Sequence, residues 1–167
     1  NRTAPLAFTG NKFEFRMVGS RDSVAASTIV LNTIVAEAFS EACDVLEKAE
    51  NFDLALHDLI KKYAADHQRI LFSGNGYSQE WVEEAEKRGL LNLKTTVDAI
   101  PHYKDEKNIK LFTKHNIFSE IEVISRTDIL LEEYSKTINI EAVTMLHIAS
   151  KEIIPAVVDY VTDVCKS

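Results

Sequence analysis

The stretch VAASTIVLNTIVAEAFSEACDVLEKAE, residues 24–50, lies inside a run from Ser20 to Ser73 that contains neither glycine nor proline. These two residues interrupt helices most often, so their absence over such a length favours long helices. Apolar and small residues recur here at intervals of three and four, the spacing of one helix face. They are Val24, Thr28, Leu31, Val35, Ala38, Ala42, Leu46 and Ala49. The stretch predicts a helix over about 24–50, roughly 40 Å long.

The segments that follow also have helical patterns. The sequence Asn51-Phe52-Asp53 predicts a turn and cap before a helix over 53–68. Ser78 predicts the N-cap of a short helix that Gly89 ends. Residues 90–107 show no clear period and are predicted to be irregular.

Two helices are predicted in the last third of the chain. Ser119 and Glu122 form a capping-box pattern, which predicts the start of a helix over 120–138. A final helix is predicted over 140–165, with Pro155 expected to kink or break it. The fold class is therefore mainly α, a helical body of about five helices with a short β element at the N-terminus.

Composition limits the class of protein. The chain has 167 residues, of which 46% are hydrophobic and 27% charged, as in a soluble globular domain. No apolar run approaches the ~20 residues of a membrane helix, so no membrane partner is expected. The first residues lack the features of a signal peptide and of an initiator Met, and we expect a piece of a longer protein. Cys43 and Cys165 are interpreted as buried free thiols of a cytoplasmic protein.

Charge is unevenly distributed along the chain. The formal net charge is −7, which argues against nucleic acid as a partner. Residues 1–22 nevertheless carry +2, from four cations and two acids, so the remainder carries −7 − 2 = −9. A basic segment on an acidic body indicates a local site for an anionic ligand.

The basic segment contains the strand pattern KFEFRM, residues 12–17. Alternation places Lys12, Glu14 and Arg16 on one face, with neighbours about 6–7 Å apart. One interpretation is a solvated strand face whose charges neutralise one another. The other is a site in which a carboxylate binds Mg²⁺ or Mn²⁺ and the cations hold phosphates. The pattern alone leaves both interpretations open.

The sequence NRTAPLAFTGNKFEFRMVGS, residues 1–20, resembles the catalytic C-terminal segment of type III glutamine synthetases. The resemblance continues along nearly the whole chain. It includes LNTIVAEA at 31–38, GNGY at 74–77, EAEKRGLLNLKTT at 84–96 and KTINIEA at 136–142. The family implies an ATP-dependent ligation of ammonia to glutamate through γ-glutamyl phosphate, with Mg²⁺ or Mn²⁺ as cofactor.

The resemblance also implies roles for four residues. Glu14 matches a carboxylate on the metal ion nearest the nucleotide phosphates, and Arg16 matches a catalytic arginine that binds substrate glutamate and γ-glutamyl phosphate. Lys12 and Arg2 match positions that contact ATP phosphate. Lys12 replaces an arginine of many relatives and lacks its bidentate fork. Ala7 stands where other classes carry a further arginine.

The same resemblance implies how the chain is organised. Residues 1–50 would be the end of the catalytic domain, and 51–167 the helical C-terminal region. The full-length enzyme would be a homo-oligomer of two stacked hexameric rings, a dodecamer, and this piece alone would be inactive. A competing hypothesis is a non-catalytic helical interaction or oligomerisation module, in which the KFEFRM strand is only a sheet edge.

The remaining polar candidates have simpler interpretations. Asp53 and His57 are expected to form a surface pair, and His147 to be a satisfied core or interface histidine. An anion-binding turn is conceivable at Gly74-Asn75-Gly76, but a plain loop is the preferred interpretation.

Overall fold

The structure is a computed structural model that describes residues 6–8, 13–15, 19 and 22–166. Most of the described chain is α-helical, which confirms the predicted class. It divides into two compact units. The first is built from the chain up to residue 94 together with 110–117, and the second from 95–109 together with 118–167.

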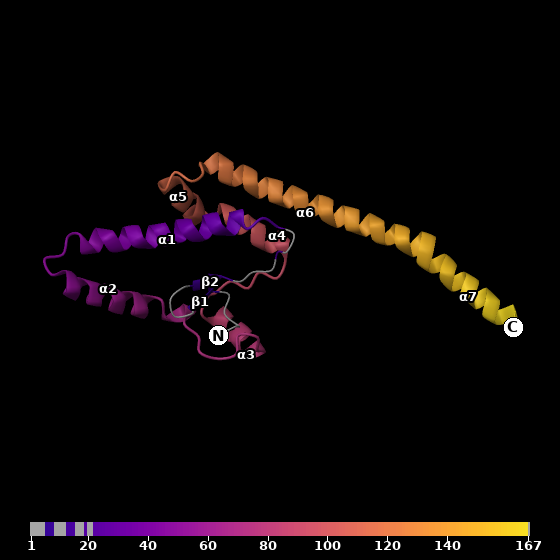
Figure 1. Ribbon diagram of the computed structural model, residues 1–167, viewed down its shortest axis with the longest axis horizontal. Helices are drawn as coiled ribbons and strands as arrows, with labels where there is room; N and C mark the ends of the chain where they lie inside the picture. The colour runs from indigo at the N-terminus through magenta and orange to yellow at the C-terminus, as the bar shows by residue number, and fades with distance from the viewer. Residues whose placement is uncertain (1–5, 9–12, 16–18, 20–21, 167) are drawn as a thin grey trace. The chain divides into compact units, whose positions relative to one another are not determined.

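The first unit combines a short two-stranded ladder with helices (Figure 1). Helix α1, Ala25–Leu46, ends four residues before its predicted end at residue 50. It contacts helix α2, Phe52–Asp66, which follows it in the chain. Asn51 caps α2 as predicted, its Oδ1 accepting from the Leu54 N–H at 3.1 Å. The elements are β1 Leu6–Phe8, β2 Phe13–Phe15, α1 Ala25–Leu46, α2 Phe52–Asp66, the 3₁₀ turn η1 Gln68–Ile70 and α3 Gln79–Lys87.

The buried face of α1 differs from the predicted one. Val24 and Val35 belong to the predicted stripe, yet they are 75% and 51% exposed, whereas Thr33 outside it is 4% exposed. The Thr33 hydroxyl donates to the Ile29 carbonyl at 2.7 Å, so its burial leaves no polar group unsatisfied. Because α1 carries apolar residues on several sides, spacing alone could not identify the side that packs.

An aromatic stack holds the loop before α3. The rings of Phe72 and Trp81 stack with centroids 4.0 Å apart, and the Arg88 guanidinium lies 5.6 Å from the Trp81 ring. Arg88 also donates to the Leu71 carbonyl at 2.9 Å and binds Glu84. These contacts tie the end of α3 back to the segment that precedes it.

The second unit contains helices that sequence patterns only partly predicted. Residues 90–107 were expected to be irregular, but they include two short helical turns and the start of a helix. The patterns were weak because each of these elements is only a few residues long. The elements are α4 Thr96–Ala99, the 3₁₀ turn η2 Ile100–Lys104, the start of α5 Glu106–Lys114, α6 Glu120–Ile148, the π turn η3 Ala149–Ile153 and α7 Ile154–Lys166. From Lys110 on, α5 belongs to the first unit.

Helix α6 begins at the predicted capping box and continues through the predicted break near residue 139 (Figure 1). It leads into η3 and then α7 without an intervening loop. In η3 the Ile154 N–H bonds the Ala149 carbonyl, five residues back. Pro155 explains this widening, because its ring would meet the carbonyl four residues earlier and it has no N–H to donate. The proline therefore interrupts the α-helix with a π turn instead of ending it.

Deep burial is confined to few of the described side chains, among them Leu59, Phe112 and Val123. None of the described helices combines the length and apolarity that crossing a bilayer requires. Cys43 and Cys165 are free, as predicted, but both are exposed, so their predicted burial is wrong. The apolar stripes around both thiols are not covered by the rest of the described chain.

Candidate functional site

The strand that carries the predicted metal ligand is paired. Strand β2 runs antiparallel to β1, and the register opposes Glu14 to Ala7 at the centre of the ladder. Leu6 pairs with Phe15 and Phe8 with Phe13 on either side. The backbone of Glu14 is thus held by a neighbouring strand, directly opposite the alanine that replaces an arginine of other classes.

The other three predicted site residues, Arg2, Lys12 and Arg16, lie outside the described residues. That these three side chains lie in one site with Glu14 remains a prediction. Across the part of the chain that the structure describes, no group of three or more His, Cys, Asp or Glu residues could hold a metal ion.

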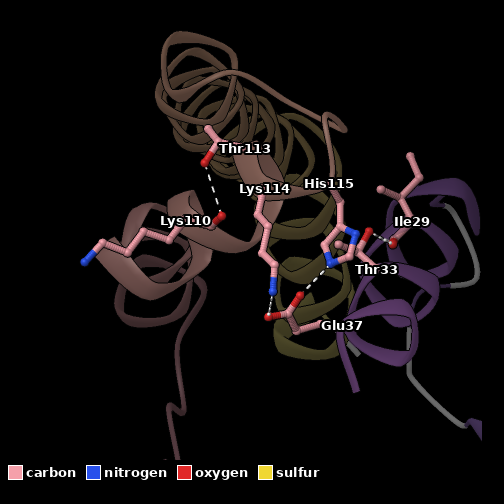
Figure 2. A network of polar contacts seen from close by, with 7 residues as sticks. All are labelled: Ile29, Thr33, Glu37, Lys110, Thr113, Lys114 and His115. Carbon is pink, nitrogen blue, oxygen red and sulfur yellow. Dashed lines mark hydrogen bonds and ion pairs between the residues drawn. The ribbon is translucent and has the colours of Figure 1, made fainter. Parts of the chain in front are cut away.

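The clearest polar network joins α1 to the end of α5 (Figure 2). Glu37 receives two side chains that follow each other in sequence. Its Oε1 accepts from Lys114 Nζ at 2.6 Å, and its Oε2 lies 2.7 Å from His115 Nε2. A carboxylate oxygen only accepts, so His115 must carry the hydrogen on Nε2. The Glu37 and His115 side chains are 23% and 20% exposed, which shields the contact from water.

The charges in this network stabilise each other. Hydrogen bonds from Lys114 and then His115 lower the pKa of Glu37 from its ordinary value of 4.5. The hydrogen bond to Glu37 raises the pKa of Lys114, and the charges of Glu41 and Asp44 add to this effect. Glu37 therefore stays ionised at neutral pH with a donor on each oxygen. Such a carboxylate connects α1 to the end of α5 through its ion pairs, and it is a poor candidate for a general base.

Sequence patterns did not identify this network. Lys114 and His115 meet Glu37 across 77 and 78 positions of sequence. The available signal was weak: Glu37 is an acid among small and apolar residues in the middle of a long helix. Its partners on α5 could not be found, because α5 itself was not predicted.

The other histidines have local roles. His57 pairs with the adjacent Asp58 at 3.4 Å, instead of with Asp53 as predicted, and both side chains are largely exposed. His102 Nδ1 lies 2.9 Å from Asp105 Oδ2 at the start of α5. His147, expected in a core or interface, is exposed in the described chain. None of these contacts assembles a catalytic arrangement within the described residues.

Comparisons with known proteins agree with one another. The family model described as the glutamine synthetase C-terminal domain matches residues 55–167. The chain is 46% identical over 159 residues to a type-3 glutamine synthetase of Dictyostelium discoideum, covering 93% of this chain and 22% of that protein. It is 41% identical over 175 residues to a glutamine synthetase of Butyrivibrio fibrisolvens, covering 99% and 24%. A glutamine synthetase of Bacteroides fragilis is 35% identical over 164 residues, covering 96% and 22%.

The chain thus spans about a quarter or less of the length of these relatives. The similarity to the Butyrivibrio fibrisolvens protein extends over the helical region as well as the strand segment, since that match covers 99% of the chain.

Proposed function

Since the chain belongs to the glutamine synthetase C-terminal domain family, we propose that it is the C-terminal part of an ATP- and metal-dependent glutamate–ammonia ligase. The reaction would join ammonia to glutamate through γ-glutamyl phosphate. One structural observation supports the site assignment: Glu14 occupies the centre of a strand whose backbone is paired on one side with β1. A paired strand can hold a ligand more rigidly than a loop can.

Four residues carry the proposed chemistry. Glu14 would contribute one carboxylate to a divalent metal. Arg16 would bind the glutamate substrate and the acyl phosphate through its planar guanidinium, which suits carboxylate and phosphate geometry. Lys12 and Arg2 would place positive charge near the ATP phosphates. Phosphoryl transfer needs such positioning and neutralisation more than it needs covalent help from the protein.

The residues of this chain fit a shared metal site. Mg²⁺ usually takes one or two carboxylates together with phosphate and water oxygens. Within the described residues no cluster supplies a complete ligand set. Glu14 is then one ligand among several that come from elsewhere in the protein. The bound Mg²⁺ or Mn²⁺ would neutralise charge on the phosphates.

The proposal extends to organisation. Residues 1–50 would close the catalytic domain and 51–167 would form the C-terminal helical region, in agreement with a family match that begins at residue 55. The chain alone would be inactive, and the parent enzyme would act as a homo-oligomer, two stacked hexameric rings. The free thiols Cys43 and Cys165 are compatible with a reducing cytoplasm.

The test uses the parent enzyme that contains this chain. Glu14→Ala and Arg16→Ala are each expected to lower ATP-dependent glutamine formation by at least about a hundredfold, the size expected when a charge-stabilising group is lost. Glu14→Ala should also raise the Mg²⁺ concentration needed for half activity. Glu133→Ala, which removes an exposed carboxylate on α6, is the matched control and should leave both values unchanged. Parental activity and metal dependence in both site variants would overturn the assignment.

The isolated chain supplies a second test. Titration calorimetry with Mg-ATP should detect no tight binding, since most of the proposed site lies elsewhere. Tight binding would contradict the shared-site proposal.

One observation favours a second role for the helical region. Large apolar side chains remain exposed along α1, α6 and α7, as in an interaction or oligomerisation module. If the parent protein lacked ligase activity under every metal and substrate condition, this module would become the first hypothesis.

A further inference from the structure

The contact at Glu37 joins the two regions of the proposed organisation. Glu37 lies on α1, in the region that would close the catalytic domain. Lys114 and His115 lie in the helical region, inside the family match over residues 55–167. Hydrogen bonds of 2.6 and 2.7 Å connect them to the two oxygens of the Glu37 carboxylate. The helical region therefore holds the helix that follows the proposed metal-binding strand.

This contact determines how α1 can sit in the first unit. Among the described residues of α1 only Thr33 is buried, and it lies one turn from Glu37 on the same face. Figure 2 shows the Lys114 and His115 side chains reaching this face. Apolar packing is not directional, whereas hydrogen bonds to a charged group are. Two donors on one carboxylate therefore fix both the rotation and the axial position of α1.

Helix α1 is attached to β2 by a short connection. Ala25, the first residue of α1, comes ten positions after Phe15, the last residue of β2. The Asp22 N–H donates to the Gly19 carbonyl at 3.0 Å, so the chain turns within this connection. A helix is a rigid element that can carry a displacement along its length. A shift of α1 at Glu37 would therefore be passed toward the strand.

The strand itself depends on the elements attached to it. Within the described residues β2 pairs with β1, three residues against three. A two-stranded ladder of this kind is at best marginally stable by itself. The place of Glu14 at the centre of β2 is thus sensitive to how α1 is held. A displacement of about 1 Å at a catalytic group can slow a reaction about a hundredfold.

We propose that Glu37 is a positioning residue of the ligase site: held by Lys114 and His115, it fixes α1 and, through α1, the strand that carries Glu14. The inference rests on the proposed function, and it gives the helical region a part in the reaction. Glu37 touches neither substrate nor metal in this role. It acts through the placement of the Glu14 carboxylate.

The test uses the parent enzyme, assayed well below the unfolding temperature of each variant. Glu37→Gln and Lys114→Met should each raise the Mg²⁺ concentration needed for half activity by about three- to thirtyfold. A smaller amount of folded enzyme would lower the rate but leave this concentration unchanged, because the remaining molecules keep an intact site. The double variant should shift it little more than Glu37→Gln does, since both changes remove one contact.

Three further variants separate positioning from charge and from stability. Lys114→Arg keeps the positive charge and should show little of the shift seen in Lys114→Met. Glu41→Gln removes an exposed acid of the same helix and should leave the Mg²⁺ requirement unchanged. Val123→Ala opens a cavity in the second unit, where Val123 is 0% exposed. It should lower the stability and also leave the Mg²⁺ requirement unchanged.

Hydrogen exchange of the parent protein examines the strand without any reaction. The amides of residues 13–15 should exchange faster in Glu37→Gln than in the unmodified protein, while those of α6 stay the same. If Glu37→Gln does not fold, Lys114→Met decides, because it leaves the carboxylate with its His115 donor.

An unchanged Mg²⁺ requirement or unchanged exchange of the strand would overturn the positioning role. If Glu14→Ala impairs catalysis and Glu37→Gln does not shift the Mg²⁺ requirement, this inference alone fails. If Glu14→Ala has no effect, the proposed site fails, and exchange at residues 13–15 still decides whether Glu37 holds the strand.

Discussion

The Nε2 atom of His115 lies 2.7 Å from Oε2 of Glu37, although 78 positions of sequence separate the two residues. Lys114 occupies the other oxygen of the same carboxylate. One acid on α1 thus fixes the end of α5 through two consecutive side chains.

Glu37→Gln should destabilise the first unit at neutral pH, because the amide keeps the shape but loses the charge that attracts Lys114. The lowered pKa of Glu37 means that its contribution is fully present above the unfolded value near 4.5 and is lost as pH falls through the lower folded value. The pKa of Lys114 is raised, so the stability that Lys114 contributes is fully present below its unfolded value of 10.5 and is lost as the pH rises above that value. Thermal unfolding of both proteins across pH measures the difference, which should shrink below the first limit and above the second.

Glu41→Gln is the control for Glu37→Gln, because it removes an exposed acid on the same helix that acts on Lys114 only at longer range. An equal loss of stability in both variants would show that general charge, and not the direct contact, stabilises the α1–α5 connection.

Gly74→Ala should disturb the aromatic stack. A Cβ at this position would lie 2.7 Å from Cζ of Phe72, closer than carbon atoms tolerate. The Phe72 ring would have to move from its position against Trp81, at a cost of about 1–3 kcal/mol. Trp81 is the only tryptophan of the chain, so its fluorescence reports the stack directly.

Gly89→Ala gives a contrasting result at the other end of α3. Gly89 has φ +70 and nothing within 4 Å of an added Cβ, so the cost is backbone strain of about 1 kcal/mol. The free energy of unfolding should fall while the Trp81 emission of the folded protein stays unchanged. An altered spectrum in this variant, or an unaltered one in Gly74→Ala, would contradict the assignment of the stack.

Ser119→Ala should weaken the start of α6. The Ser119 hydroxyl accepts from the Glu122 N–H at 3.4 Å, and Glu122 accepts in turn from the Ser119 N–H at 2.8 Å. Loss of such a cap costs about 1 kcal/mol. Ser125→Ala, at an exposed position within the same helix, should be neutral or slightly stabilising, because alanine is the better helix former. Urea unfolding of the two variants distinguishes the cap from a general effect of losing a hydroxyl.

Phe112→Ala should be among the most damaging substitutions in the described chain. Phe112 is 3% exposed, and removing a buried phenylalanine typically costs about 3–5 kcal/mol. Leu91→Ala removes a side chain that is 66% exposed and should have little effect. Comparable midpoints of thermal unfolding for the two variants would show that α5 is not part of the stabilising core.

Local sequence determined the helix class and several boundaries of this protein. Asn51, Ser78 and the Ser119–Glu122 box each act within four residues, and the structure has a helix start at all three. Tertiary structure decided what depends on distant partners. It buried Thr33 and left Val35 of the predicted apolar stripe exposed. It also brought Lys114 and His115 into contact with Glu37. The reason is physical: caps and helical periods are set by neighbours along the chain, whereas burial and long-range ion pairs depend on which surfaces meet after folding.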